Sequence, residues 1–201
     1  MIQGQILRGT PFGELIYKIS NKKEVTNILE IGTWYGLGST KCVIDGIMDS
    51  QDQKNFITIE MYENMYETAK NNLKDYMDKF QLLKGTILKP EDIYWFNFSD
   101  LDPNQYKKTW YDSDLITLQT SENVLDKIFD KIDFLILNGG EFTTYPEWLI
   151  LKERTKIVAL DDTNVFKCKK IREELLNDTS YRIIVDVISE RNGYSVFEKI
   201  I

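Results

Sequence analysis

The chain has 201 residues, of which 42% are hydrophobic and 28% are charged. This composition is typical of one globular domain with a hydrophobic core, and it excludes disordered and fibrous classes of protein. The formal net charge is -7, so binding to nucleic acid or to an anionic membrane would need a local basic patch, and we expect neither partner. The chain contains no histidine, which excludes nucleophiles activated by histidine and zinc sites built from histidine.

The two cysteines, Cys42 and Cys168, are far apart in the sequence and form no metal-binding spacing, so we expect two reduced thiols. The first twenty residues lack the apolar core of a signal peptide, and no run of about 18 apolar residues occurs. We therefore expect a cytoplasmic protein without a membrane span. No internal repeat or linker is visible, which predicts one domain over residues 1–201.

Short β-branched runs alternate with longer amphipathic stretches from residue 27 onward, which predicts an α/β fold with a mostly parallel sheet covered by helices. The first half is predicted to contain strands over 27–31, 56–60 and 80–84, with helices over 38–48 and 62–77 between them. The alternation then breaks. Residues 89–120 carry two prolines and seven large aromatic side chains, and we interpret them as an insertion.

The second half is predicted to contain helices over 121–130, 145–151 and 166–176, with strands over 132–137 and 156–160. The strand over 132–137 is apolar throughout, as expected of a buried central position. The tail, 181–187 and 194–200 around Arg191-Asn192-Gly193, is predicted to form an antiparallel hairpin that closes the sheet.

The turn after the first predicted strand carries the most specific pattern, EIGTWYGLGS over residues 30–39. Its glycines let a ligand approach the backbone closely at the carboxyl end of a strand, where open α/β sheets bind their ligands. A dinucleotide fingerprint requires G-x-G-x-x-G, whereas the pattern here is G-x-x-x-G-x-G, with Trp34 at the second glycine position. No Gly-Lys-Ser/Thr follows, so the turn is not a P-loop either.

This turn, together with Glu60 at the end of the second predicted strand, resembles the cofactor signature of class I S-adenosylmethionine (SAM) methyltransferases. In that family the glycine turn passes beneath the methionine part of SAM, and the acid that ends the second strand accepts hydrogen bonds from the ribose hydroxyls. The resemblance implies a Rossmann-like sheet of seven mostly parallel strands, with an antiparallel carboxyl-terminal hairpin and helices on both faces. Chemistry supports Glu60 independently, because a carboxylate only accepts hydrogen bonds and can receive both protons of a diol.

The resemblance implies SAM as the cofactor. It assigns the following cofactor-binding residues: Glu30, Gly32, Thr33, Gly36, Ser39, Glu60, Met61 and Asn138. Alternatively, Glu30 caps a nearby helix, and glycine turns occur in many α/β proteins.

Two later segments, IDFLILNGGE over 132–141 and IVALDD over 157–162, resemble motifs of small O-methyltransferases. In the metal-dependent members, acids that end strands four and five hold a divalent cation that binds the acceptor hydroxyls. The resemblance implies a site for Mg²⁺ or Mn²⁺ formed by Asn138, Asp161 and Asp162, whose oxygen ligands suit such cations. Alternatively, Asp161 caps the next turn and Asp162 is solvated at the strand end.

The chain departs from that pattern at two positions, with Asn138 in place of an aspartate and Glu141 in place of a histidine. The first change removes a negative charge and should weaken a metal site. The second places a carboxylate where a general base could act if partial burial raises its pKa; alternatively, it is a surface carboxylate. Glu141 and Asp161 are the predicted catalytic residues, either of which could take the acceptor proton.

The aromatic insertion suggests a lid over the acceptor, with Tyr94, Trp95, Trp110 and Tyr111 as substrate-binding residues, because aromatic faces stack on sugars and rings. Alternatively, these side chains form satellite core or the subunit interface of a homo-oligomer. A basic cluster, Lys167, Lys169, Lys170 and Arg172, is interpreted as a solvated helix face because acidic residues flank it.

The predicted function is transfer of the SAM methyl group to a hydroxyl of a small molecule or sugar (glycan). The alternatives are a binding or scaffold subunit of the same fold without catalysis and a nicotinamide-dependent oxidoreductase, which Trp34 disfavours. Methylation of nitrogen is less favoured, since no N/D-P-P-Y segment follows the fourth predicted strand.

Overall fold

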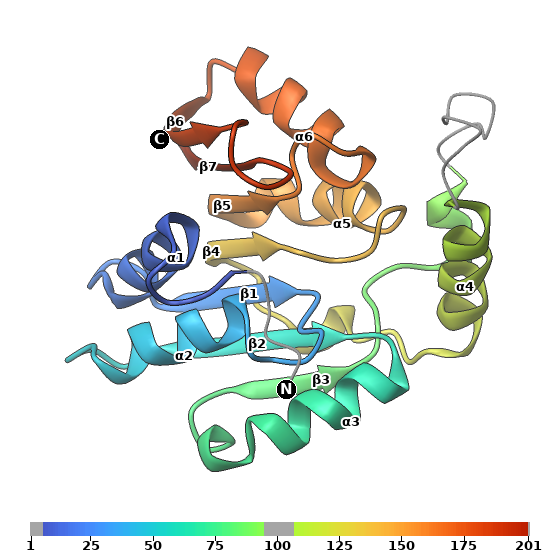
Figure 1. The fold of residues 1–201 in the computed structure, drawn as a ribbon, viewed down its shortest axis with the longest axis horizontal. Helices are drawn as coiled ribbons and strands as arrows, with labels where there is room; N and C mark the ends of the chain where they lie inside the picture. The colour runs from blue at the N-terminus through green and yellow to red at the C-terminus, as the bar shows by residue number, and fades with distance from the viewer. Residues whose placement is uncertain (1–5, 95–106, 201) are drawn as a thin grey trace.

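The computed structural model describes residues 6–94 and 107–200 and is shown in Figure 1. Within these residues seven strands form one sheet in the order β3-β2-β1-β4-β5-β7-β6. The strands are β1 (Asn27–Ile31), β2 (Asn55–Glu60), β3 (Gln81–Lys84), β4 (Ile132–Leu137), β5 (Thr155–Asp161), β6 (Tyr181–Val187) and β7 (Tyr194–Lys199). β1 to β5 pair in parallel, whereas β7 pairs antiparallel with both β5 and β6. The predicted Rossmann-like sheet with its antiparallel hairpin is confirmed.

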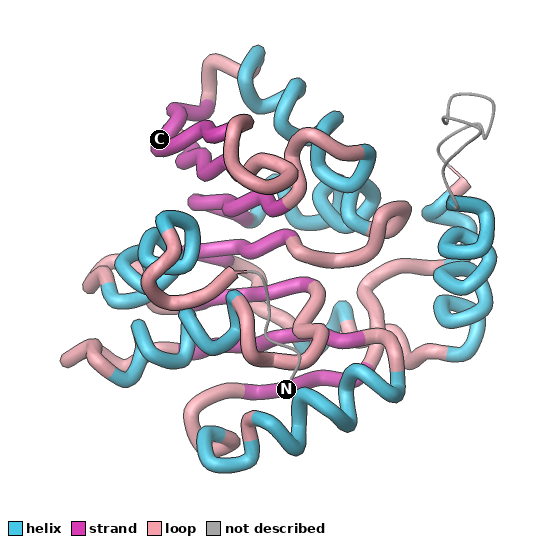
Figure 2. The backbone as a smooth tube through the Cα atoms, in the orientation of Figure 1, coloured by secondary structure: helices cyan, strands magenta, loops and turns pink. Residues whose placement is uncertain are grey.

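Helices cover both faces of this sheet, as the tube in Figure 2 shows. One face is covered by α1 (Pro11–Asn21), α2 (Ser39–Met48) and α3 (Glu63–Asn72), and the other by α5 (Thr144–Leu151) and α6 (Phe166–Asn177). α4 (Lys107–Thr120) lies beyond the carboxyl ends of the strands (Figure 1). The short 3-10 helices η1 (Lys74–Tyr76), η2 (Pro90–Ile93), η4 (Leu125–Lys127) and η5 (Lys152–Arg154) lie in the connections.

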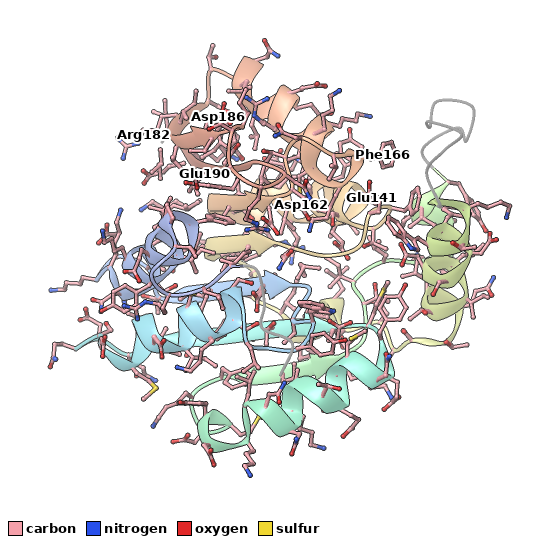
Figure 3. The ribbon with its side chains drawn as sticks, viewed as in Figure 1. Glu141, Asp162, Phe166, Arg182, Asp186 and Glu190 are labelled. Atoms are coloured by element: carbon pink, nitrogen blue, oxygen red, sulfur yellow. The ribbon has the colours of Figure 1, made fainter. Side chains whose placement is uncertain are left out.

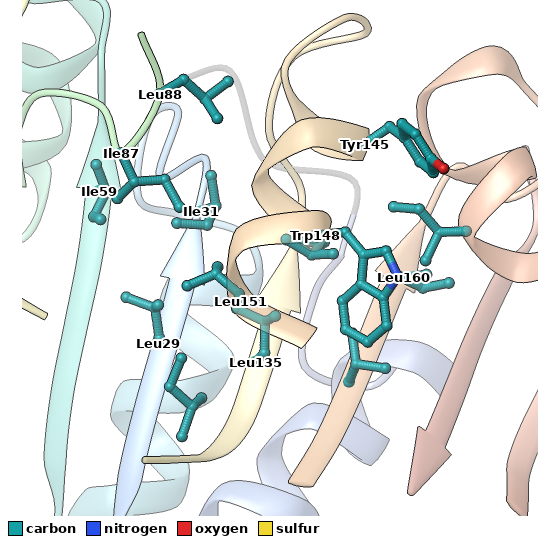
Figure 4. Packing of buried hydrophobic residues seen from close by; sticks show 14 of the residues in the cluster. Leu29, Ile31, Ile59, Ile87, Leu88, Leu135, Tyr145, Trp148, Leu151 and Leu160 are labelled. Atoms are coloured by element: carbon teal, nitrogen blue, oxygen red, sulfur yellow. The ribbon is translucent and has the colours of Figure 1, made fainter. Parts of the chain in front are cut away.

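Alternating side chains of the strands build two separate cores. In β1, Ile28 packs with α1 and α2, whereas Leu29 and Ile31 belong to the core that includes α5 and α6. Figure 4 shows this second core, in which Trp148 and Leu151 of α5 lie over the strands. Burying each such side chain stabilises the fold by about 1.5–3 kcal/mol relative to exposure.

This arrangement fixes the position of a ligand site. The chain leaves β1 toward α2 on one face and leaves β4 toward α5 on the other, so the connections diverge between two neighbouring parallel strands. Open α/β sheets bind ligands in the crevice outside the carboxyl ends of their strands at such a switch point.

Several helices differ from the sequence-based expectations, and α3 ends at Asn72 although the predicted helix ran to residue 77. The helix predicted over 121–130 is wrong, because the backbone at Glu122 and Val124 hydrogen-bonds residue 86 instead and leaves only η4. α4 lies inside the predicted insertion, where Tyr111, Leu115 and Leu118 recur at helical spacing and pack against the core.

α1 precedes the first predicted element. It begins at Pro11 after Thr10, whose side chain accepts a hydrogen bond from the Gly13 amide, as helix N-caps do.

The cysteines are both buried and unpaired, as expected. In the described parts of the chain no helix is long and apolar enough to span a membrane.

Candidate active site at the carboxyl ends of the strands

The glycine turn between β1 and α2 depends on backbone conformations with positive φ. Gly32 has a φ of 92°, and a Cβ there would lie 2.2 Å from the carbonyl oxygen of Asn138. Its missing side chain therefore lets the ends of β1 and β4 approach closely. Trp34 also has a positive φ, 51°, a conformation that few non-glycine residues adopt.

Gly36, at a φ of 76°, serves packing rather than a ligand cavity. A Cβ there would lie 2.5 Å from Cδ1 of Leu73, just after α3. Gly36 lines neither of the two cavities described below. Its direct contact with a cofactor stays a prediction, and its evident role is to seat the turn against α3.

Gly32→Ala should destabilise the protein by about 2 kcal/mol or more, because the new methyl group meets backbone atoms of Asn138 and Gly139, just after β4, and the residue keeps an unfavourable φ. Gly9→Ala is the matched control, since Gly9 has a φ of 87° and a Cβ there would meet nothing within 4 Å. Urea unfolding measures the loss of stability in both variants, and the difference between them gives the cost of the close contact beyond the cost of the positive φ. Equal losses would show that the contact with β4 is unimportant.

Glu30 is completely buried at the start of the turn and accepts hydrogen bonds from three hydroxyls. Ser39 donates to Oε1 at 2.5 Å, while Thr40 and Thr58 donate to Oε2 at 2.6 and 2.7 Å. Burial raises the pKa of Glu30, and these three hydrogen bonds oppose the rise. Glu30 lines neither cavity, so the structure gives it a positioning role: it ties the first turn of α2 to β1 and β2.

A cavity of about 370 Å³ lies at the ends of β1, β2 and β4, and Gly32, Glu60 and Asn138 are among its lining residues. Glu60 is 6% exposed. Its Oε2 accepts a hydrogen bond from the Trp34 amide at 2.8 Å, and its Oε1 accepts one from the Tyr62 amide at 2.9 Å. Each carboxylate oxygen keeps further acceptor capacity, so the two amides hold Glu60 in place for a ligand with adjacent hydroxyls.

Burial raises the pKa of Glu60 to about 7, although three backbone amides lower it. A ligand that donates hydrogen bonds to Glu60 would favour its ionised form. Beyond Glu60 the cavity is lined by apolar side chains, Met61 after β2 and Ile87 after β3, which suit the faces of a flat ring.

Glu147 of α5 lines the same cavity and was not anticipated from the sequence. It is 4% exposed, and its Oε2 has no hydrogen-bond partner among the described residues. Burial, with the nearby charge of Asp114, raises the pKa of Glu147 to about 8. Asp114 of α4 accepts a hydrogen bond from the hydroxyl of Tyr62, and burial raises its pKa to about 6. Two carboxyl groups whose pKa values are raised by burial, Glu60 and Glu147, therefore line this cavity.

A second cavity, of about 140 Å³, is lined by Thr33, Ser39, Asp161 and Arg191 among others. Trp34 and Asn138 line both cavities, so the two are neighbours across these residues. The second cavity is polar, with hydroxyl, carboxylate and guanidinium groups in its wall. The predicted cofactor-binding residues that line a cavity are therefore shared between the two cavities. Gly32, Glu60 and Met61 line the first, Thr33 and Ser39 line the second, and Asn138 lines both.

The three predicted metal ligands converge on one point, and an ammonium group is there. Nζ of Lys167 lies 2.9 Å from Oδ1 of Asn138, 2.9 Å from Oδ2 of Asp162 and 3.9 Å from Oδ2 of Asp161. In the described ranges no group of three or more metal-binding side chains of the His, Cys, Asp or Glu type is placed to hold an ion. The side chains as arranged do not fit a divalent cation, and the predicted metal site is not supported.

The interpretation of Lys167 as a solvated residue is wrong. Lys167 is 6% exposed, whereas Lys169 and Lys170 are exposed as expected. Burial alone would lower the pKa of Lys167, but Asp161 and Asp162 together hold it above its usual value. Arg172 is half-buried and forms two hydrogen bonds with Asp186.

The two aspartates at the end of β5 respond differently to their surroundings. Burial and the charge of its neighbour raise the pKa of Asp161 despite Lys167 and Arg191. Burial acts in the same direction on Asp162, but the charge and hydrogen bond of Lys167 hold its pKa below the usual value. Asp161 therefore retains the greater tendency to hold a proton, although both of its oxygens lie within 3.2 Å of the Arg191 guanidinium.

Glu141, labelled in Figure 3, lies in the connection between β4 and α5. It is half-buried and lines neither cavity. Its catalytic role stays a prediction.

The predicted aromatic substrate residues do not line either cavity where they are described. Tyr94 and Trp110 are exposed, and Tyr111 packs edge-on against Phe142 with ring centroids 5.3 Å apart. The position of Tyr111 agrees with the satellite-core alternative. Trp95 lies outside the described residues, and the lid stays a prediction.

The order of the strands, with antiparallel β7 between β5 and β6, is that of a Rossmann-like fold. No protein-family model and no curated protein matches the chain in sequence. Solved structures do share the fold. A Staphylococcus aureus protein assigned to the caffeoyl-CoA O-methyltransferases superposes with a TM-score of 0.61 at 18% identity, covering 93% of this chain and 82% of that one.

Two further structures of the same fold were solved with ligands. The SAH-bound methyltransferase PaMTH1 of Podospora anserina has a TM-score of 0.61 and 13% identity, covering 93% of this chain and 77% of that chain. The O-methyltransferase TomG of Streptomyces achromogenes, involved in tomaymycin synthesis and solved with SAM, has a TM-score of 0.59 and 14% identity, covering 94% and 79%. At these identities the likeness establishes the fold.

Proposed function

We propose that the protein transfers the methyl group of SAM to a hydroxyl oxygen of a small molecule. The observation that carries this proposal is Glu60, a buried carboxylate that two backbone amides hold at the wall of a 370 Å³ cavity. Such a group is suited to a buried vicinal diol, and the apolar wall beyond it is suited to a nucleobase. Structures of the same fold that bind SAM or SAH support this choice of ligand.

The second cavity suits the amino-acid end of SAM. Arg191 in its wall supplies a cation for the carboxylate of that end. Because Trp34 and Asn138 line both cavities, one extended molecule could contact both. Thr33 and Ser39 would then act near the same end of the molecule.

SAM supplies an activated methyl group on a positively charged sulfur. In such a transfer the acceptor oxygen would gain the methyl carbon as the carbon–sulfur bond breaks, and the sulfur would become neutral. The acceptor hydroxyl must release its proton to a base, for which Glu141 and Asp161 are the proposed groups. Holding both reactants in line can contribute about 7–11 kcal/mol of the barrier reduction, so most of the protein's work is orientation.

Calorimetric titration with SAH and with NAD⁺, side by side, tests the cofactor. We expect the protein to bind SAH saturably and not to bind NAD⁺. Tighter binding of NAD⁺ than of SAH would favour an oxidoreductase. Incubation of the protein with SAM and panels of small alcohols, phenols, sugars and amines then tests the acceptor through SAH release. Binding without turnover on any panel would instead support a binding or scaffold subunit.

A further inference from the structure

The ammonium group of Lys167 lies at the point that the oxygens of Asn138, Asp161 and Asp162 surround. This ammonium group donates hydrogen bonds to Asn138 and Asp162, both at 2.9 Å, and lies within ion-pair distance of Asp161 at 3.9 Å. An ammonium group has three hydrogen-bond donors and no acceptor, and Asn138 and Asp162 accept from two of these donors. Lys167 is thus the cation that this oxygen cluster holds.

The remaining oxygens of the acidic pair also have donors. Both oxygens of Asp161 accept from the Arg191 guanidinium, at 3.1 and 3.2 Å, and Oδ1 of Asp162 accepts from the Asn192 side chain at 3.1 Å. Two carboxylates therefore face two cationic side chains, and the formal charges balance. A divalent ion would have to displace hydrogen bonds from each carboxylate and would also be repelled by Lys167.

The position of Lys167 in its helix is unfavourable unless the acids are present. It is the second residue of α6, and a cation in the first turn of a helix opposes the helix dipole. The side chain is also buried, and a buried ammonium without partners would lose its proton. Its placement is therefore explained by the oxygens that it contacts.

We infer that Lys167 occupies the position of a divalent cation at this edge of the sheet, and that the site works with a built-in ammonium instead of a metal ion. Its chemical consequence rests on the proposed function: the acceptor hydroxyl gains no acidity from a bound metal, so a protein side chain must take its proton. The binding prediction itself does not depend on SAM. Removing Lys167 should uncover the oxygens and create a site for a hard cation.

Mn²⁺ binding to the purified chain of 201 residues tests this inference, with free Mn²⁺ followed by electron paramagnetic resonance. We expect no saturable binding to the unmodified protein at up to about 1 mM Mn²⁺, and at least tenfold tighter binding by Lys167→Ala, since small oxygen clusters favour such cations. Lys169→Ala, on the exposed face of the same helix, should behave as the unmodified protein. The double variant Lys167→Ala/Asp162→Asn should lose the Mn²⁺ binding that Lys167→Ala alone gains.

Three results would overturn the inference. The first is saturable Mn²⁺ binding by the unmodified protein that is lost in Asp162→Asn. The second is a folded Lys167→Ala variant that binds Mn²⁺ no more tightly than Lys169→Ala does. The third is SAH release by the unmodified protein that stops when a chelator is added. Should Lys167→Ala fail to fold, Lys167→Gln, which keeps a donor to the cluster, replaces it with the same expectation. SAH titration of the same samples is independent, so absence of SAH binding would contradict the proposed function and leave the Mn²⁺ result interpretable.

Discussion

Glu60→Ala should weaken SAH binding by about 10- to 150-fold, equivalent to about 1.5–3 kcal/mol, because hydrogen bonds from the ribose hydroxyls to a charged acceptor are lost. Calorimetric titration measures the change. Glu63→Ala removes an exposed acid three residues further along the chain and should leave the affinity unchanged. Because the Ala variant also leaves the Trp34 and Tyr62 amides without their acceptor, a melting curve should accompany each titration.

The same residue gives the affinity a pH dependence. With the pKa of Glu60 at about 7 in the unliganded protein, the carboxyl is mostly protonated at pH 6 and mostly ionised at pH 8. Only the ionised form accepts hydrogen bonds from both hydroxyls with its two oxygens, so SAH affinity should rise with pH across this range. Glu60→Gln should flatten the rise. An affinity independent of pH in the unmodified protein, or an unchanged affinity in Glu60→Ala, would contradict the ribose assignment.

Glu147→Gln should change how stability depends on pH. The folded-state pKa of Glu147, about 8, is above the ordinary glutamate value of 4.5, so the folded state binds the proton more tightly than the unfolded state does. The protonated group therefore favours folding at low pH, and this contribution is lost as the pH rises from about 4.5 through 8. Relative to the unmodified protein, Glu147→Gln should gain on the order of 3–4 kcal/mol between pH 5 and pH 9.

Urea unfolding at several pH values measures this difference, and the comparison across pH cancels any constant loss from burying an amide. Glu67→Gln, at an exposed position of α3, is the control and should show no such trend. If the free energy of unfolding of Glu147→Gln runs parallel to that of the unmodified protein from pH 5 to pH 9, burial does not raise the pKa of Glu147.

The sequence was sufficient for the sheet because strand signals are local. Buried β-branched runs such as 132–137 can form little else, and each of the seven predicted strands matches a strand of the structure within one residue at either end. The helix predicted over 121–130 failed for a non-local reason, since that backbone pairs with residue 86. The repeat of Tyr111, Leu115 and Leu118 would have indicated α4, but the surrounding aromatic and acidic residues obscured it.

The site was predictable where a motif determines it and not where contacts between distant segments do. Glu60 lines the cavity because it ends β2, which the strand pattern shows directly. Lys167 looked like part of a solvated basic cluster, and only the packing of α6 against β4 and β5 reveals its partners. A lysine in the first turn of a helix, a few residues after two aspartates, was the one local signal. Glu147 had none, because its burial follows from where α5 lies.

The location of β7 has a consequence for how the molecule assembles. β7 follows β6 in the chain but lies between β5 and β6, and its register places Tyr194 beside Asp161. Arg191, in the turn before β7, can therefore reach Asp161 only once that strand has inserted. Without β7 in this place, Asp161 and Asp162 in the second cavity lack the positive charge of Arg191. The balanced set of charges at the end of β5 therefore depends on the same strand that completes the sheet.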